Sequence, residues 1–377
     1  MKTTKVGIIG CGMISDAYFK ASSKFNILEV VACSDIIPER SAKKHEMYGV
    51  ANVTNEELLA NKDIEIVINL TPPQVHSKIA MDALNAGKHT HSEKPFGVDA
   101  ADAAKVMTLS KEKNLRVGCA PDTFLGAGQQ TARKMLDDGW IGKPLSGVAM
   151  IMGRGPEKWP HAPFFYDYGA GPMLDLGPYY ITALVNMLGP AVAVTAVTKK
   201  GFETRRIGPE VAPQYQHMVE PYGEYPVNVT THLTGLIEFA NGALITVLTS
   251  FDIITNAKTK DYYNFQIHGT EGTMLVPDPN GFGGDVQIFR KGYDNWVTAP
   301  QAHNYKENSR SIGAADMAYA LRSGRKHRCS GELANHVLDI MLAFDRSSKA
   351  GARVELTTTC ERPAPLPMGL MEGELDA

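Results

Sequence analysis

The sequence predicts an α/β protein with two domains: an N-terminal doubly wound parallel sheet and a C-terminal α+β domain with a large, mostly antiparallel open sheet. Its 377 residues are 44% hydrophobic, which suffices for two buried cores. From residue 5 to about 120, short apolar runs alternate with helical patterns, whereas the later runs are longer and alternate β-branched with polar residues. We therefore expect domains of residues 1–121 and 122–377.

The first half contains short runs that we interpret as parallel strands. Helical patterns such as 81–87 and 100–114 lie between them. Alternation of this kind is typical of a parallel sheet that helices cover on both faces. The runs lie at 6–10, 29–35, 65–71, 88–95 and 115–120.

The second half contains longer strand-like runs. Asn241-Gly242 lies between two of them and predicts a hairpin turn. The proline-containing stretch 202–226 shows little periodicity and predicts a long loop. Helical patterns return at 311–324 and 332–351, and we expect the helix near 332–350 to pack back on the first domain. The strand-like runs lie at 144–153, 191–201, 228–252 and 264–277.

The composition argues against several classes of function. The formal net charge is -3 and the basic residues are dispersed, so we expect no nucleic-acid partner. The apolar runs are too short for a signal peptide or a membrane span, which favours a cytoplasmic protein. The cysteines are far apart and form no C-x-x-C pair, so we expect reduced thiols and no metal. They are Cys11, Cys33, Cys119, Cys329 and Cys360.

A glycine-rich motif follows the first predicted strand. Residues 10–15 match G-x-G-x-x-G, with serine in the third glycine position. Gly10 permits a tight turn, Gly12 lets the backbone approach a pyrophosphate, and the helix that follows offers free N–H groups. We predict that Gly10, Gly12, Met13 and Ile14 contact a dinucleotide in a Rossmann domain. The alternative is a glycine turn in an α/β protein that binds no nucleotide.

Asp35 ends the second predicted strand, near the spacing expected for a carboxylate that binds a ribose 2′-hydroxyl. Its charge would repel a 2′-phosphate, so the sequence favours NAD. Arg40 follows five residues later and offers a possible partner for a 2′-phosphate, which leaves NADP open.

Three further stretches place polar groups where chemistry is expected. TPPQVH (71–76) and EKP (93–95) follow two predicted parallel strands, and ligands bind beyond the carboxyl ends of such strands. LDLGPYY (174–180) begins a predicted helix in the second domain.

With GIIGCGMIS and the hairpin-bearing sheet, these stretches resemble the glucose–fructose oxidoreductase / inositol dehydrogenase (Gfo/Idh/MocA) family over nearly the whole chain. The resemblance implies a Rossmann domain, an open-sheet C-terminal domain and NAD(P)-dependent oxidation of sugars, polyols and related alcohols. It implies that Lys94 is catalytic. It also implies cofactor contacts for Thr71, Pro72, Pro73, His76, Glu93 and Lys94.

Position 179 departs from the histidine that many relatives of this family carry after an Asp-x-Gly motif. Tyrosine here resembles the branch that contains glucose–fructose oxidoreductase and the dimeric dihydrodiol dehydrogenases. We predict that Tyr179 accepts the hydroxyl proton, with Lys94 lowering the phenol pKa and stabilising charge on the substrate oxygen. Asp175 would orient the substrate or Lys94.

The same residues also have structural interpretations. Asp175 could satisfy free N–H groups at a helix start, and Tyr179 could be an ordinary half-buried aromatic. Tyr180 is the adjacent candidate for the proton carrier. Lys94 could be a plain surface lysine, and His76 a structural histidine at a helix start.

The stretch 153–173 is rich in aromatic and polar residues that suit a carbohydrate. We predict substrate contacts for Trp159, His161 and Tyr166, with an ordered packing loop as the alternative. Asp122 and Thr123 replace the Asn or Arg residues of many relatives, and a carboxylate there favours a neutral ligand over an acid.

The sequence therefore predicts an NAD-dependent dehydrogenase that oxidises a hydroxyl of a neutral sugar, glycoside or polyol. The alternatives are an NADP-linked keto-sugar reductase, a dihydrodiol-type dehydrogenase, and a non-catalytic nucleotide-sensing protein. One face of the long-stranded sheet would need cover, and relatives typically pair such faces, so we expect a homodimer or homotetramer.

Overall fold

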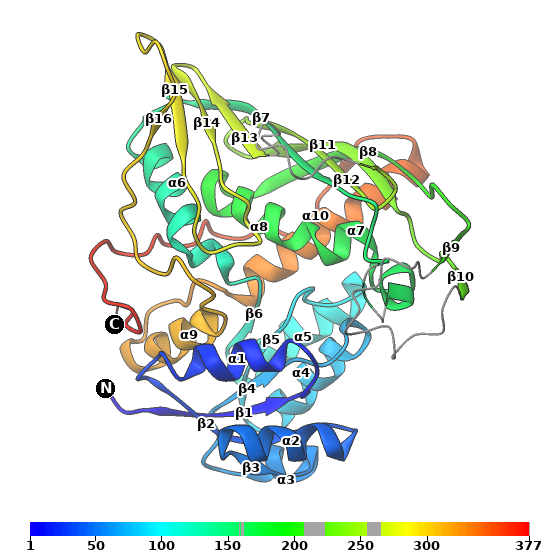
Figure 1. Cartoon of the computed structure of the whole chain (residues 1–377), viewed down its shortest axis with the longest axis vertical. Coiled ribbons are helices and arrows are strands. Elements are labelled where there is room, and N and C mark those ends of the chain that lie inside the picture. Colours follow the sequence, from blue (N-terminus) through cyan, green and yellow to red (C-terminus); the bar gives the residue numbers. More distant parts are fainter. Residues whose placement is uncertain (158, 160–161, 207–222, 255–264, 377) are drawn as a thin grey trace.

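The structure is a computed structural model that describes residues 1–157, 159, 162–206, 223–254 and 265–376. Two sheets lie one above the other, with the N-terminal sheet at the bottom of Figure 1 and the C-terminal sheet at the top. Helices α6, α8 and α10 lie between them. This arrangement confirms the predicted fold class.

The N-terminal sheet has six parallel strands in the order β3-β2-β1-β4-β5-β6. The chain reverses direction across the sheet between β1 and β4, which is where ligands bind in doubly wound folds. Every predicted run contains a strand. The two-residue β3 was not predicted, because so short a strand leaves no pattern. The strands are β1 Thr4–Ile9, β2 Leu28–Ser34, β3 Ala51–Asn52, β4 Ile66–Asn69, β5 His89–Ser92 and β6 Val117–Cys119.

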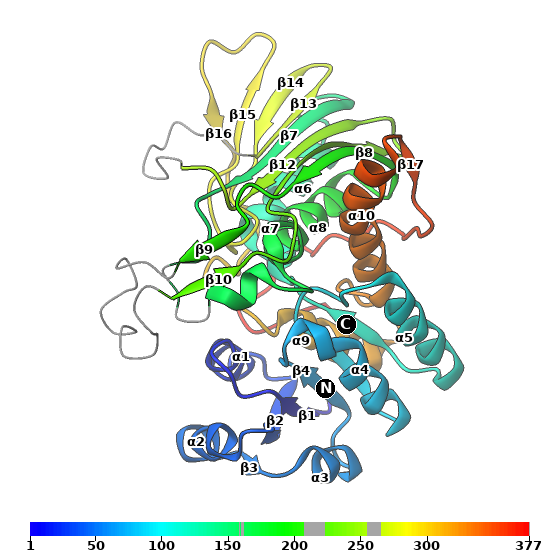
Figure 2. The same cartoon turned by 90° about the vertical axis from the view of Figure 1, so that its right-hand side faces the viewer.

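Helices cover both faces of this sheet. Figure 2 shows α1 and α2 on one side and α3, α4 and α5 on the other. Two of these helices begin with side-chain caps: Thr54 and Glu57 form a capping box at α3, and Asp99 caps α5. The elements are α1 Ser15–Ser22, α2 Pro38–Tyr48, α3 Asn55–Ala60, the 3₁₀ turn η1 Pro73–Val75, α4 His76–Asn85 and α5 Ala100–Lys113.

The C-terminal sheet has nine described strands in the order β16-β15-β14-β13-β7-β12-β11-β8-β17. Among these strands only β7 and β12 pair in parallel. The predicted hairpin joins β11 to β12, and Gly242 takes the positive φ of 89° that its turn requires. The strands are β7 Pro144–Met152, β8 Ala191–Lys199, β11 His232–Phe239, β12 Leu244–Ser250, β13 Phe265–Gly269, β14 Gly272–Leu275, β15 Gln287–Arg290, β16 Val297–Thr298 and β17 Val354–Glu355.

The predicted long loop 202–226 contains a small two-stranded sheet. Its strands are β9 Thr204–Arg206 and β10 Glu224–Pro226. Between them, residues 207–222 lie outside the described part of the chain.

Helices cover one face of the large sheet. The long helix α10 packs on β8 and α8, and it also contacts α5 and β6 of the N-terminal half. Helix α9 contacts β6, β4 and α1, so the chain returns to the N-terminal sheet after leaving it. The boundary after residue 121 stays a prediction. The elements are η2 Thr123–Leu125, α6 Ala127–Asp137, η3 Ala162–Tyr166, α7 Gly171–Asp175, α8 Gly177–Leu188, α9 Ile312–Ser323 and α10 Gly331–Ala350.

Apolar side chains remain exposed on the strands of this sheet, among them Val192, Val197 and Leu244. A homodimer or homotetramer stays a prediction. None of the described helices combines the length and the apolar character needed to cross a bilayer.

Candidate active site

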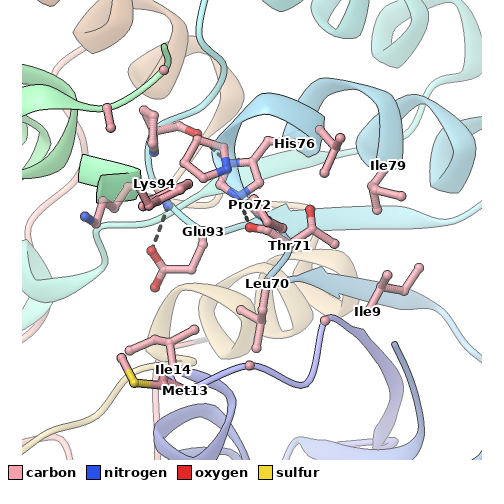
Figure 3. A pocket seen from close by; sticks show the side chains of 18 of the residues that line it. Ile9, Met13, Ile14, Leu70, Thr71, Pro72, His76, Ile79, Glu93 and Lys94 are labelled. Carbon is pink, nitrogen blue, oxygen red and sulfur yellow. Dashed lines mark hydrogen bonds between the residues drawn. The ribbon is translucent and has the colours of Figure 1, made fainter. Parts of the chain in front are cut away.

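A cavity of about 660 Å³ lies at the carboxyl edge of the N-terminal sheet, under α7 and α8. Met13 and Ile14 face Glu93 and Lys94 across it (Figure 3). Its walls include all the residues expected to bind the cofactor. They are Gly10, Gly12, Met13, Ile14, Asp35, Thr71, Pro72, Pro73, His76, Glu93 and Lys94.

The two motif glycines have different roles. Gly10 has a φ of 100°, and a Cβ there would lie 2.7 Å from the carbonyl carbon and oxygen of Leu70. Its lack of a side chain therefore lets β1 end close against the end of β4. A Cβ on Gly12 would meet no protein atom within 4 Å. Gly12 instead keeps space open beside the start of α1, whose first turn has no side-chain cap.

Asp35 lies directly after β2 at the edge of the cavity. Its Oδ2 accepts the Cys11 N–H at 2.7 Å, and its Oδ1 accepts the Ile37 N–H at 2.8 Å. These bonds hold the carboxylate beside the glycine loop. Arg40 and Asn55 line the same end of the cavity.

The glycine loop and Asp35 together suit a dinucleotide. Open space beside Gly12 and uncapped N–H groups at α1 fit a pyrophosphate, and a carboxylate held nearby fits a ribose diol.

His76 connects the ends of two neighbouring strands. It is buried, its Nδ1 lies 2.7 Å from the Pro95 carbonyl, and its Nε2 lies 2.7 Å from the Thr71 carbonyl. Burial lowers the pKa of His76, so the neutral ring, with one N–H, is favoured. His76 therefore contacts Pro95, the residue after Lys94, and helps to position it. His76 also lines the cavity.

Lys94 and Asp175 form a tight pair across the cavity. Lys94 Nζ lies 2.6 Å from Asp175 Oδ1 and 2.7 Å from the Asp175 carbonyl oxygen, and the side chains are 16% and 21% exposed. Burial alone would lower the pKa of Lys94, but the charges of Asp175, Tyr179 and Glu93 outweigh it and raise this pKa. Lys94 is thus a charged ammonium. Asp175 ends α7 and makes no cap to α8, so the structure does not support the helix-cap interpretation.

Tyr179 projects from the first turn of α8 into the cavity. Lys94 Nζ lies 5.4 Å from the centre of its ring. Burial raises the pKa of Tyr179 above its ordinary value, and the opposing charges of Lys94 and Arg310 do not overcome this effect. Lys94 therefore lowers this pKa as expected, but burial of the phenol is the larger effect and the net change is upward.

Tyr180 points away from the cavity. Its hydroxyl donates to Asp278 Oδ1 at 3.3 Å, and its ring packs against Phe265 at 5.6 Å between centroids. Of the two adjacent tyrosines, the geometry brings Tyr179 to Lys94.

Glu93 connects helix α1 to the backbone of Lys94, just after β5. Its Oε1 accepts the buried Tyr18 hydroxyl at 2.7 Å, and its Oε2 accepts the Lys94 N–H at 2.9 Å. The carboxylate therefore fixes the backbone of Lys94 relative to α1.

Asp122 and Thr123 do not reach the cavity. Both are buried, and Asp122 Oδ2 accepts the Ser311 N–H at 3.0 Å and the Gly313 N–H at 3.2 Å at the start of α9. Burial raises the pKa of Asp122 to about 6. The substrate contacts expected of Asp122 and Thr123 are wrong, because the Asp122 carboxylate instead accepts hydrogen bonds from N–H groups at the start of α9. Asp122 therefore gives no support to a neutral substrate.

The aromatic loop contributes different residues from those predicted. Tyr166 is buried, donates to Glu157 Oε1 at 3.0 Å and packs with Tyr225 and Phe251, so it stabilises the loop instead of lining the cavity. Trp159 is 44% exposed and is not part of the wall. His161 lies outside the described residues. The loop residues that line the cavity are Phe164, Phe165, Gly169, Ala170 and Leu174.

These missed residues carried a weak signal, since Phe164 and Phe165 stand in the same stretch as the polar residues that we chose. Which rings of such a loop face a cavity depends on how the loop folds. In the described part of the chain, no cluster of His, Cys, Asp and Glu could hold a metal ion.

Comparison with known proteins defines the class. Residues 4–120 match the oxidoreductase family with an NAD-binding Rossmann fold, and residues 129–275 match the GFO/IDH/MocA C-terminal domain. The chain belongs to the Gfo/Idh/MocA family of oxidoreductases, and its N-terminal sheet forms an NAD-binding Rossmann domain.

Two relatives in sequence are carbohydrate dehydrogenases. Levoglucosan dehydrogenase of Pseudarthrobacter phenanthrenivorans is 27% identical over 349 residues, which cover 85% of this chain and 86% of that protein. Inositol 2-dehydrogenase/D-chiro-inositol 3-dehydrogenase of Lactiplantibacillus plantarum is 34% identical over 153 residues, which cover 38% and 42%.

Solved structures share the fold. Levoglucosan dehydrogenase in complex with NADH has a TM-score of 0.77 at 24% identity, covering 95% of this chain and 100% of that one. Aldose-aldose oxidoreductase from Caulobacter crescentus has a TM-score of 0.76 at 20% identity, covering 94% and 100%.

Proposed function

We propose that this protein is an NAD-dependent dehydrogenase that oxidises a hydroxyl of a neutral sugar, glycoside or polyol by hydride transfer to C4 of the nicotinamide. One observation carries the proposal: the Lys94 ammonium, which follows β5 of the N-terminal sheet, and the Tyr179 phenol of α8 meet in the cavity that begins at the glycine loop.

Each side chain of the site has a different role in oxidation of the substrate hydroxyl. Tyr179, in its phenolate form, takes the hydroxyl proton and becomes a neutral phenol as the carbinol carbon gives its hydride to the nicotinamide. The Lys94 ammonium stabilises the negative charge that develops on the substrate oxygen. Asp175 holds that ammonium in place through its 2.6 Å contact, and Glu93 holds the Lys94 backbone. Phe164, Phe165 and Leu174 supply apolar wall against the C–H surface of a carbohydrate.

The carboxylate of Asp35 supports NAD as the cofactor. A 2′-phosphate beside it would meet a like charge, whereas a free diol would donate to it. The relatives named for levoglucosan and inositol support a neutral polyhydroxylated substrate.

Arg40 favours a second candidate, an NADP-linked keto-sugar reductase. Arg40 lines the same cavity as Asp35, and a guanidinium would suit a 2′-phosphate. The two candidates differ in the ratio of kcat/KM for the two cofactors.

The test is a substrate screen with NAD or NADP. Purified protein is mixed with levoglucosan, myo-inositol, aldoses and glycosides, and reduced nicotinamide is followed by its absorbance. We expect turnover of at least one neutral carbohydrate with NAD, and none in a Lys94→Ala variant that still binds NAD. Tight NAD binding with no turnover across the panel would overturn the proposal in favour of a nucleotide-sensing protein.

A further inference from the structure

A second cavity lies at the opposite edge of the N-terminal sheet from the active site. Its volume is about 1080 Å³, and it lies where β5 and β6 begin, whereas Lys94 follows the carboxyl end of β5. Its walls come from the end of α5, the starts of β5 and β6, the segment that joins α9 to α10, and residues 359–364 after β17. Among the described residues, the two cavities have no wall residue in common. The second cavity is therefore a separate site.

Basic side chains are abundant in the wall of this second cavity. Four of its six lysines and arginines pair with carboxylates of the described residues. The pairs are Arg325 and Arg328 with Asp316 and Asp376, Lys326 with Glu361, and Arg362 with Asp137. The other two, Lys111 and Arg116, form no ion pair within the described part of the chain, and neither does Glu332 of the same wall. Two unpaired cations thus stand against one unpaired carboxylate.

Arg116 carries a guanidinium that the fold leaves unused. The Arg116 N–H donates to His89 Nδ1 at 2.9 Å, and the Arg116 carbonyl accepts the Thr90 N–H at 3.1 Å, so its backbone is held against β5. Its side-chain Nη1 is buried and has no hydrogen-bond partner among the described residues. Burial and the charge of Arg325 lower the pKa of Arg116 more than Asp316 raises it. A buried donor without an acceptor and a like charge nearby both cost free energy, and an anion bound to the guanidinium would offset both costs.

His89 and Lys111 line the same cavity and supply two further hydrogen-bond donors. Because His89 Nδ1 accepts the Arg116 N–H, the neutral His89 ring carries its proton on Nε2. Burial lowers the pKa of His89 to about 4, and the charge of Arg116 adds to this effect, so the ring is neutral near pH 7. Neither His89 Nε2 nor Lys111 Nζ makes a hydrogen bond to any residue that the structure describes. Donors from the end of α5 and the starts of β5 and β6 therefore lack acceptors at one cavity.

We propose that the second cavity binds the phosphoryl group of a small phosphorylated molecule or free phosphate. A phosphoryl group presents three strong acceptor oxygens and about two negative charges near pH 7, which match the donors of His89, Lys111 and Arg116 and the excess of unpaired cations. The planar guanidinium of an arginine suits two such oxygens at once. Apolar side chains such as Leu115 and Val117 line the same cavity and would contact the remainder of an organic ligand. This inference does not depend on the proposed dehydrogenase function.

The test is calorimetric titration of the full chain at low ionic strength in a buffer free of phosphate. The protein is saturated with NAD, so that nucleotide probes cannot bind at the glycine loop. The probes are inorganic phosphate, glucose 6-phosphate and AMP, and we expect a dissociation constant of about 1 mM or lower for at least one of them. Tighter binding of glucose 6-phosphate or AMP than of phosphate would support the site and identify an organic phosphate as its ligand. Equal binding would support the site and identify free phosphate.

Variants of the cavity wall locate the binding. Arg116→Gln should weaken it about tenfold or more, because charge-assisted hydrogen bonds to the phosphoryl oxygens are lost. Glu332→Gln, which removes the unpaired carboxylate, should tighten it several-fold. Lys113→Gln changes an exposed lysine in the last turn of α5, outside the cavity wall, and should leave binding unchanged as the matched control. Equal binding by wild type and Arg116→Gln, or no binding of any probe at about 10 mM, would overturn the proposal.

Urea unfolding separates a binding role of Arg116 from a structural one. Without ligand, Arg116→Gln should unfold at the same urea concentration as wild type or at a higher one, because its Nη1 has no partner to lose and Arg325 loses a like-charged neighbour. With the probe that binds wild type most tightly, the midpoint should rise in wild type and rise less or not at all in Arg116→Gln. A lower midpoint of the ligand-free variant would make Arg116 a structural residue and overturn its role in binding.

Discussion

The two ends of the cavity are built in different ways. The glycine-loop end takes Gly10, Gly12 and Asp35 from one short stretch of chain, and much of its geometry is backbone conformation. The lysine–tyrosine end brings together Lys94, which follows β5, and Tyr179 of α8, with Asp175 beside them. The first end depends on close backbone packing, whereas the second depends on charges that converge through tertiary structure. Substitutions at the two ends should therefore fail in different ways.

The largest effect should come from Lys94→Ala at the lysine–tyrosine end. We expect kcat to fall about 10²-fold or more, because one stabiliser of the developing oxyanion is lost. The dissociation constant of NAD, measured by calorimetry, should change little. Lys105→Ala, which removes an exposed lysine from α5, serves as the control. Normal turnover in Lys94→Ala would remove this lysine from the mechanism.

The adjacent tyrosines provide a sharper comparison within one helix turn. Tyr179→Phe should lower kcat by about 10²-fold with little change in stability. Tyr180→Phe should leave kcat within about threefold but lower the free energy of unfolding by about 1 kcal/mol, since Asp278 loses a hydrogen-bond donor. Steady-state kinetics and urea unfolding on both variants provide the test. A kinetic effect confined to Tyr180→Phe would show that Tyr180 is the proton carrier.

Substitutions of the two motif glycines should have different effects: one on NAD binding and the other on the free energy of unfolding. Gly12→Ala should weaken NAD binding about tenfold while changing the unfolding free energy by less than about 0.5 kcal/mol, because its Cβ points into open space. Gly10→Ala should destabilise the fold by about 1–3 kcal/mol, because of its positive φ and the clash with Leu70. Calorimetric titration with NAD and urea unfolding distinguish the two. Equal loss of stability in both variants would contradict the division.

The smallest effect should come from Asp35→Asn. Removing the carboxylate charge while keeping its shape should raise kcat/KM with NADP relative to NAD by about tenfold, since the repulsion of a 2′-phosphate is relieved. The ratio of kcat/KM for the two cofactors measures this change. A wild-type ratio near one would contradict the role assigned to Asp35.

Several features of the site follow from local sequence. Gly10 and Asp35 follow strands with readable hydrophobic runs, and the EKP stretch follows the more polar strand β5, so their positions at one sheet edge could be predicted. The 3₁₀ turn at Pro73 and the hairpin at Gly242 likewise follow from short-range backbone preferences.

Other features needed the complete fold. The Asp122 carboxylate accepts a hydrogen bond from the start of α9, and the Tyr166 ring packs in a cluster of buried rings. In both cases the partners are far away in sequence. Such contacts depend on distant segments meeting, which a single sequence does not display.

The sequence by itself determined the longer strand-like and helical runs and the turn at the glycine loop, because these depend on hydrophobic period and backbone preference. It also placed a lysine after one strand and a tyrosine at the start of one helix. Only the tertiary structure decided that Tyr179 and not Tyr180 faces Lys94. Neighbouring residues on a helix point about 100° apart, and the packing of α8 on the sheet selects which one meets the cavity.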